Sequence, residues 1–342
     1  MKHHRTLSSS ESRVRSGDHP VPRMVTAGID GSYASMDAAD WAAREALRHG
    51  VPLRLVHAGA PAAHPVRARR AARPADRARG VLDRAAITLA YGHPALEIHA
   101  QQPCGPVVPA LLGASERAES LVLGSRGLAG FAGFLVGSVA AAVATRAERP
   151  VVLVRAGERP EDAHVPDADG AASRATPYRP VVLGLDVEDG ENAGGAGDTE
   201  TTENTARAGD ALLAYAVAAA AARGAPLHVV HAWAVPPPRK APSPAARSGL
   251  TDLTDLTDAL GLEKRARDRL AAAVEPWRRA RPHVEIVERT VFGRPGHHLL
   301  KAATGASLLV IGRRLAGGPR LGRTAHSAVH HVACPIAVVP HA

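Results

Sequence analysis

Residues 120–145 read SLVLGSRGLAGFAGFLVGSVAAAVAT, and they are the most informative stretch of the chain. Leu121 to Leu123 is a short apolar run typical of a buried strand, and Val139 to Thr145 has the composition of a helix. Gly124 and Gly127 follow the strand, and Gly137-Ser138 precedes the helix. The stretch therefore predicts a strand, a glycine-rich loop and a helix in succession.

The loop between this strand and helix has the composition of a phosphate-binding loop. Glycines just past a strand let the backbone approach a ligand closely. A Gly-Ser pair that begins a helix offers free N–H groups, a hydroxyl and the positive end of the helix dipole. The alternative is a flexible turn followed by a helix cap, and glycine spacing alone does not separate the two.

The chain also repeats itself, with four segments of the first half recurring in the same order in the second. The pairs are 25–30 with 181–186, 50–58 with 224–232, 120–124 with 308–312, and 150–154 with 335–339. Each copy spans roughly 150 residues, which is the ordinary size of one domain. The pattern indicates a tandem duplication, since a solenoid needs many shorter repeats.

Within each copy, expected strands alternate with helical stretches. In the first copy we predict strands near residues 24–30, 52–58, 95–101, 120–124 and 150–155, and a helix from Ser35 to His49 that Gly50 ends. This alternation is typical of a parallel sheet covered on both faces. The predicted fold class is α/β, with two tandem doubly wound, Rossmann-like domains, each a five-stranded parallel sheet with helices on both faces. Ligands of such sheets bind beyond the carboxyl ends of the strands, where Asp30 and Gly124 stand.

The predicted boundaries follow from composition. We expect a disordered basic tail at 1–22, a first domain at 23–156 that carries the glycine-rich loop, a Pro- and Gly-containing linker at 157–178 and a second domain at 179–342. Two insertions, 188–198 and 236–249, follow strands of the second copy and would lie over its pocket as a lid or a filling. A helix is expected to begin near Asp258.

These motifs together resemble the universal stress protein family in its tandem two-domain form. The resemblance rests on an opening strand that ends in Gly-Ile-Asp-Gly-Ser (28–32), a second strand that ends in Leu-Val-His-Ala (55–58), the pattern Gly-x2-Gly-x9-Gly-Ser (124–138) and a closing Pro-Val-Val-Leu-Val (150–154). It covers nearly the whole chain, from Met24 to Pro340.

The resemblance implies a pocket for ATP or a related adenine nucleotide in the first copy, with Mg²⁺ as a candidate companion ion. Asp30 and the backbone around Gly28, Ile29 and Ala58 would hold adenine and ribose, and Leu123 would form an apolar wall. Ribose and phosphates would lie against Gly124, Gly127, Gly137, Ser138 and the N–H of Val139.

The second copy departs from this pattern. Gly312 matches the first glycine, but Leu315 stands in place of the second, and Arg323 replaces the serine after Gly322. The side chains in this loop prevent its backbone from approaching a phosphate as closely as glycines allow. Its arginines could instead supply positive charge to a phosphate. We expect a degenerate copy kept for pairing and stability; the retained Asp186 leaves an adenine-sized pocket as the alternative.

Other chemistry has little support in the residues. The chain lacks a Gly-x4-Gly-Lys-[Ser/Thr] loop and a Gly-x-Gly-x2-Gly after its first strand. Cys104 and Cys334 are expected to be buried structural thiols, and His57 and His231 structural histidines. Adjacent histidines at 297–298 and 330–331 point to different helix faces, so neither pair makes a metal site by itself.

The formal net charge of +9 comes from scattered arginines, and only 3% of residues are aromatic, so we do not expect a nucleic-acid partner. The densest group of arginines, between Arg67 and Arg79, is typical of a solvated helix face, with an acidic partner or a phosphate backbone as the alternative. Without an apolar run long enough for a membrane span or a signal segment, a cytoplasmic location is expected.

The leading hypothesis is an ATP-binding stress or dormancy regulator that is not an enzyme, a role that comes from the resemblance. One alternative is a tandem interaction scaffold that binds no nucleotide, and another is a slow ATP hydrolase or adenylyl transferase. We also expect the two copies to meet within the chain through their last strands, Val151–Val154 and Ile336–Val339, because exposed apolar edges invite aggregation. A further homodimer stays open.

Overall fold

The computed structural model describes residues 23–59, 74–125, 136–187, 199–234, 253–316 and 318–341. Several sequence-based expectations fall outside these residues: the tail at 1–22, Gly127, most of the arginine group that starts at Arg67, and the insertions at 188–198 and 236–249.

The first copy alternates strands and helices as the sequence predicts. Its elements are β1 (Met24–Gly28), α1 (Tyr33–His49), β2 (Leu53–Val56), α2 (Pro74–Gly92), β3 (Ile98–Gln101), α3 (Val107–Glu116), β4 (Ala118–Ser125), α4 (Ser138–Ala144) and β5 (Val151–Arg155). The five strands are parallel and follow the order β3-β2-β1-β4-β5.

The second copy repeats this order. After a 3-10 turn, η1 (Pro160–Ala163), its elements are β6 (Val181–Gly184), α5 (Thr199–Arg223), β7 (Leu227–Trp233), α6 (Leu253–Ala280), β8 (Ile286–Phe292), α7 (Pro295–Ala303), β9 (Leu308–Arg314), α8 (Arg323–His331) and β10 (Ile336–His341). Helix α6 begins at Leu253, five residues before the expected start near Asp258. Residues 253–258, which read Leu-Thr-Asp twice, are already helical.

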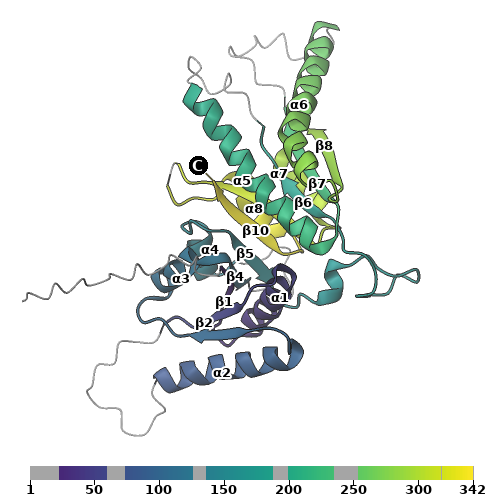
Figure 1. Ribbon diagram of the computed structural model, residues 1–342. Helices are drawn as coiled ribbons and strands as arrows, with labels where there is room; N and C mark the ends of the chain where they lie inside the picture. Colours follow the sequence, from purple (N-terminus) through teal and green to yellow (C-terminus); the bar gives the residue numbers. More distant parts are fainter. Residues whose placement is uncertain are drawn as a thin grey trace, which may run out of the picture.

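The two copies form one continuous sheet of ten strands (Figure 1). Strand β5 lies antiparallel to β10, with Leu153 opposite Ile336 and Val151 opposite Val338. The other neighbouring strands run parallel, so the sheet reverses direction at this central pair. The apolar last strands of both copies are therefore interior strands and not edges.

Alternating residues of the strands divide the core between the two faces of the sheet. On one face, Val25 and Ala27 pack with α1 and α2, and the same layer continues under α5 and α6. On the other face, Leu121 and Leu123 pack with α3 and α4, and α7 and α8 cover the second copy. This confirms the doubly wound arrangement with helices on both faces.

Helix α1 has well-defined ends for reasons that are visible in its sequence. The hydroxyl of Ser32 accepts a hydrogen bond from the N–H of Ser35 at 3.2 Å and caps the start. Gly50 ends the helix with φ of 63°, a left-handed conformation that costs glycine little. Ten residues of α1 are buried, including Trp41 and Glu45. Helix α1 is thus fixed between the carboxyl edge of the first copy and the junction with the second.

Neither cysteine residue is fully buried, although both were expected to be: Cys334 is half-buried. Cys104 is exposed, so the prediction of a buried thiol is wrong there; it follows β3, the outermost strand of the first copy. Cys334 precedes the central strand β10, and burial raises the pKa of its thiol to about 12. Among the described residues, no helix is both long and apolar enough to cross a membrane.

Candidate functional site

The candidate site lies at the carboxyl edge of the first copy, where the strand order reverses. The chain passes from β1 to β2 on one side and later returns to β4 on the other. Gly28 is in register with Val56 of β2 and with Leu123 of β4. In doubly wound sheets this switch point is the crevice in which ligands bind.

Asp30 stands just beyond β1, in an exposed position. Its Oδ1 accepts hydrogen bonds from the N–H of Ser32 at 2.9 Å and from the Ser32 hydroxyl at 2.6 Å, while the Asp30 N–H lies 3.3 Å from the Ser35 hydroxyl. These bonds fix the turn into α1. The carboxylate is thereby held at the rim of the crevice.

Gly124 lets α1 begin directly against the end of β4. A Cβ atom at Gly124 would overlap the Ala34 carbonyl and lie 2.9 Å from the Ser35 nitrogen. This glycine therefore has a packing reason that glycine spacing in the sequence does not reveal. It brings the start of α1, with Asp30, next to the end of β4.

The apolar wall of the crevice has more members than the sequence predicts. Leu123 is buried, and its Cδ2 lies 2.5 Å from where a Cβ at Gly28 would stand. Leu111 of α3 approaches the same point at 3.3 Å. Ala58 packs against this same cluster, as do Val108 and Val136. The α3 residues were missed because they follow β3, outside the glycine motif, and the apolar start of α3 is the signal that could have found them.

Helix α4 begins at the same edge with an open N-terminus. Gly137 is its N-cap, and its first turn receives no side-chain cap. Ser138 and Val139 are exposed, and no atom of the described residues lies within 4 Å of a Cβ built at Gly137. The backbone N–H groups of this turn are thus available to a ligand.

His57 and His231 hold equivalent places after β2 and β7. The Nδ1 atom of His57 lies 2.7 Å from the Ile29 carbonyl oxygen, and that of His231 lies 3.1 Å from the Leu185 oxygen. Each ring therefore joins the ends of two neighbouring strands. This supports the expected structural role.

The second copy fills the equivalent edge with its own residues. Strands β9 and β10 stay paired out to Arg314 and His341, and the N–H of Leu315 donates to the His341 carbonyl at 2.8 Å. A Cβ at Gly312 would lie 2.7 Å from Nε2 of His341, where the first copy has the start of α1. The end of β10 thus occupies the space beside the second copy's glycine.

The two arginines of this loop are also engaged. Arg314 lies 3.8 Å from the carboxylate of Asp186, the counterpart of Asp30. Arg313 is buried, and its Nη2 donates to the Ala147 carbonyl in the first copy. Arg313 therefore holds the copies together and does not face a ligand at the edge.

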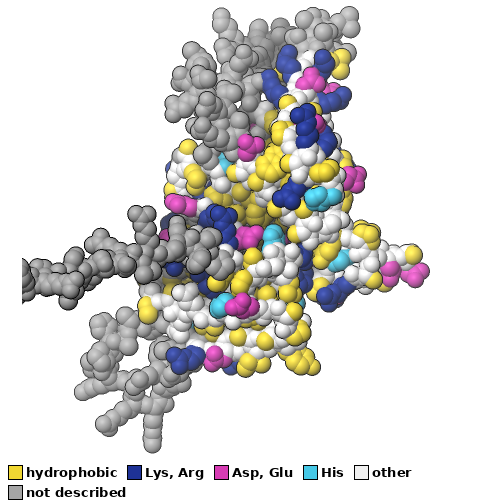
Figure 2. Space-filling model, in the orientation of Figure 1, with side chains coloured by type: hydrophobic (Ala, Val, Ile, Leu, Met, Phe, Trp, Pro, Cys, Tyr) yellow, Lys and Arg dark blue, Asp and Glu magenta, His cyan; other side chains and the backbone are white. Residues whose placement is uncertain are grey.

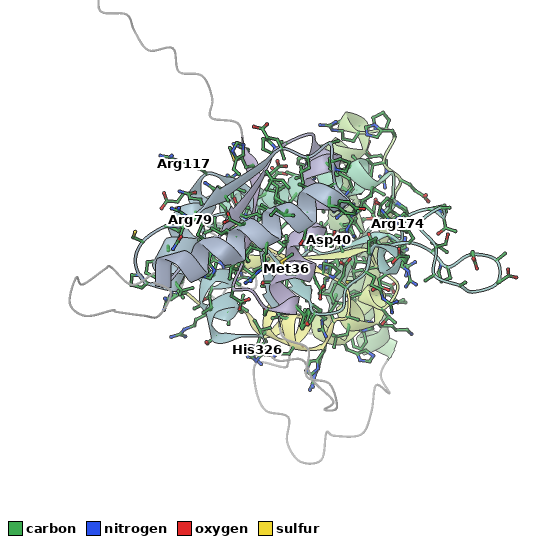
Figure 3. The ribbon with its side chains drawn as sticks, turned by 90° about the horizontal axis from the view of Figure 1, so that it is seen from below. Met36, Asp40, Arg79, Arg117, Arg174 and His326 are labelled. Carbon is green, nitrogen blue, oxygen red and sulfur yellow. The ribbon has the colours of Figure 1, made fainter. Side chains whose placement is uncertain are left out.

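Two cavities between described residues are lined by neither Gly124 nor Gly137. The larger, of about 160 Å³, lies between the start of α1 and α2 and is lined by Gly31, Met36, Val81, Arg84, Ala85 and Thr88. Figure 3 labels Met36 beneath α2. Within the described ranges, no group of three or more His, Cys, Asp or Glu side chains is placed to hold a metal ion.

Charges on the outer face of the second copy are mixed. Figure 2 shows Lys and Arg side chains along α6 interspersed with acidic ones. Arg267 pairs with Glu263 at 2.9 Å, and Arg279 with Glu275 at 2.8 Å, each one turn apart on α6. Paired charges of this kind are typical of a solvated helix face.

The family model of the universal stress proteins matches residues 23–155 and 204–340, one segment in each copy. The chain belongs to the universal stress protein family. Its two matched segments agree with the tandem form that the repeated motifs predict.

Relatives of the same tandem length occur among universal stress proteins. One from Mycobacterium tuberculosis is 28% identical over 335 residues, covering 92% of this chain and 96% of the relative. A second from the same species is 34% identical over 147 residues, which is 40% of this chain and 49% of that one. The crystal structure of a universal stress protein from Archaeoglobus fulgidus, 17% identical, covers 93% of this chain and 98% of its own with a TM-score of 0.57. That likeness shows the shared fold.

Proposed function

We propose that the first copy of this universal stress protein binds ATP at its carboxyl edge. The observation that carries the proposal is the convergence of three chain segments at the switch point: Asp30 after β1, Gly124 near the end of β4, and the uncapped start of α4 at Gly137. A carboxylate at the rim suits ribose hydroxyls, and free helix N–H groups suit phosphates. Ala58 and Leu123 supply apolar surface for the base.

We infer that the second copy does not bind ATP in the same way. Leu315 replaces the second motif glycine, His341 fills the space beside Gly312, and Arg314 engages Asp186. A nucleotide bound there would have to displace Leu315 and His341 and break the contact between Arg314 and Asp186. Pairing through β5 and β10 gives this copy a structural role instead, and we propose that the two copies act in solution as one unit.

Within the cell we propose a regulatory role in stress or dormancy, in which bound ATP is a signal and not a substrate. Rapid phosphoryl transfer needs a metal held by a carboxylate, a cation at the γ-phosphate and a residue that orients water. Residues 125–136 contain one charged side chain, Arg126, and no carboxylate. Glycine N–H groups that bind ground state and transition state equally do not accelerate the reaction.

Equilibrium binding of ATP to the unaltered protein and to two variants tests the site. Gly127→Leu copies the second copy's Leu315 and should weaken ATP binding by about tenfold or more, because a side chain then stands where backbone must approach phosphate. Asp186→Ala should leave binding unchanged. If Asp186→Ala lost ATP binding and Gly127→Leu retained it, the nucleotide would lie in the second copy. Absence of binding in the unaltered protein would favour the scaffold alternative.

Phosphate release in excess Mg·ATP separates a sensor from an enzyme. We expect turnover far below the ordinary enzyme range of about 1 per second or more. Steady turnover in that range, lost in a Ser138→Ala, Gly137→Asp variant, would overturn the regulatory proposal and favour the hydrolase alternative.

A further inference from the structure

Two histidines of α8, His326 and His330, meet on one face of the helix. One helical turn separates them, and their ring centroids are 4.5 Å apart with the ring planes inclined by 58°. His326 is exposed and His330 is half-buried. Figure 3 shows His326 at the outer edge of the second copy. The two rings in contact thus come from residues one turn apart, and not from the adjacent pair His330-His331 that stands out in the sequence.

The spacing of the rings suits a shared metal ion. A Zn–N bond is about 2.0–2.1 Å, so the centre of a ligating imidazole lies roughly 3.2 Å from the metal. Two such rings at ligand angles of about 90–110° have centres roughly 4.5–5.2 Å apart. The observed 4.5 Å falls at the lower end of this range. The ring spacing is therefore compatible with both imidazoles binding one ion, once each side chain turns a nitrogen toward it.

We propose that His326 and His330 form a two-histidine site for a divalent transition metal ion such as Zn²⁺ or Co²⁺. Imidazole is a preferred ligand of these ions, and two histidines four residues apart on a helix present their nitrogens on one face. Water or a small anion completes the coordination, because no third protein ligand stands at the site among the described residues.

Comparison of the two copies adds an independent observation. Helices α4 and α8 hold equivalent places, each starting after an N-cap glycine, Gly137 and Gly322. Counting from these caps, His326 and His330 correspond to Ala141 and Thr145 of the first copy. The fold itself needs no histidine at either position. The pair is a property of the second copy alone.

A bound metal would stabilise α8 and the layer beneath it. The helix has nine residues, and its inner face buries Ala325, Ala328 and Val329. A metal that joins successive turns binds the helical conformation and not the unfolded chain, so it raises stability by mass action. This effect belongs to the second copy and is separate from ATP binding in the first.

Zinc binding to the full chain tests the proposal. All proteins carry His3→Ala and His4→Ala, so that the paired histidines near the start of the sequence do not contribute. Zn²⁺ is titrated in competition with a chromophoric chelator, and the unfolding temperature is followed with and without Zn²⁺. We expect His326→Ala and His330→Ala each to weaken one Zn²⁺ site by about tenfold or more, since even outer-shell changes act on that scale.

The matched control is His331→Ala, an exposed neighbour on the same helix. It should keep both the zinc site and the zinc-dependent rise in unfolding temperature. Alanine is the best helix former, so each variant keeps α8. Absence of saturable Zn²⁺ binding, or equal affinity in His326→Ala and His331→Ala, would overturn the proposal.

Discussion

Arg223 of α5 donates hydrogen bonds to both carboxylate oxygens of Glu45 of α1, Nη1 to Oε1 at 3.1 Å and Nη2 to Oε2 at 2.7 Å. These two hydrogen bonds join the second copy to the first, and the side chains of Arg223 and Glu45 are 1% and 4% exposed. Burial alone would raise the pKa of Glu45, but the charges of Arg223 and Arg48 hold it well below its usual range. The copies are thus joined by a buried charge cluster as well as by β5 and β10.

Glu45→Gln should destabilise the protein by about 3–5 kcal/mol, because it leaves Arg223 buried without a compensating charge. Urea unfolding measures the change. The control is Glu263→Gln, which breaks an exposed pair with Arg267 on α6 and should cost at most about 0.5 kcal/mol. Equal, small effects of the two variants would show that the cluster does not hold the copies together.

His49 should make stability depend on pH. Its hydrogen bond to Glu119 at 2.9 Å, together with Glu45, raises the pKa of His49 to about 9 from an ordinary 6.5. Protonated His49 therefore favours the folded state, fully below about pH 6.5, and this contribution is lost as the pH rises to about 9. Arg48, Arg223 and Tyr215 face the same cluster.

The measurement compares unfolding temperatures of the unaltered protein and His49→Gln at about pH 6 and pH 9.5. The difference in unfolding temperature between the two proteins should be large at the lower pH and small at the higher pH. His99→Gln, at an exposed pair with Glu97, is the control and should show little gap at either pH. A gap for His49→Gln that does not change with pH would contradict the assignment.

Gly124→Ala should destabilise the first copy by about 1–3 kcal/mol or more, because the added methyl overlaps the backbone of Ala34. Gly137→Ala adds the same methyl in open space with φ of −59° and should cost less than about 1 kcal/mol. Chemical denaturation of both variants checks this. A larger loss at Gly137 than at Gly124 would show that α1 does not rest on β4 as described.

The two thiols should react at very different rates. Cys104 is exposed, whereas burial raises the pKa of Cys334 to about 12 and leaves almost no thiolate near neutral pH. In native protein, a thiol reagent should label Cys104 quickly and Cys334 much more slowly. Comparing Cys104→Ser with Cys334→Ser separates the two. In Cys104→Ser the thiol that remains is Cys334, so fast labelling of this variant in its native state would contradict the raised pKa of Cys334.

Local patterns were enough to predict the alternation of strands and helices, because the central strands are apolar runs next to Gly or Pro, as at Leu121–Gly124. The repeat confirmed which runs were strands. Contacts between distant segments could not be predicted in this way. Glu45 and Arg223 lie 178 residues apart, and neither pattern nor spacing links them.

The site was predictable in outline only. The motif identifies Gly124 and Gly137, but it does not say that Gly124 is required by α1 packing or that Gly137 is open. It likewise could not show that His341 fills the second copy's edge, because His341 lies at the end of β10, outside the motif. Such differences depend on strand length and register, which a glycine pattern does not encode.

Calorimetric titration of the full chain with ATP tests the central claim most directly, because it measures the number of sites as well as the affinity. The account predicts saturation at one ATP per chain, held by Asp30, the backbone at Gly124 and the start of α4 at Gly137. Saturation at two equivalent sites would mean that the second copy's edge is open, and the absence of binding would mean that the crevice of the first copy is not a nucleotide site.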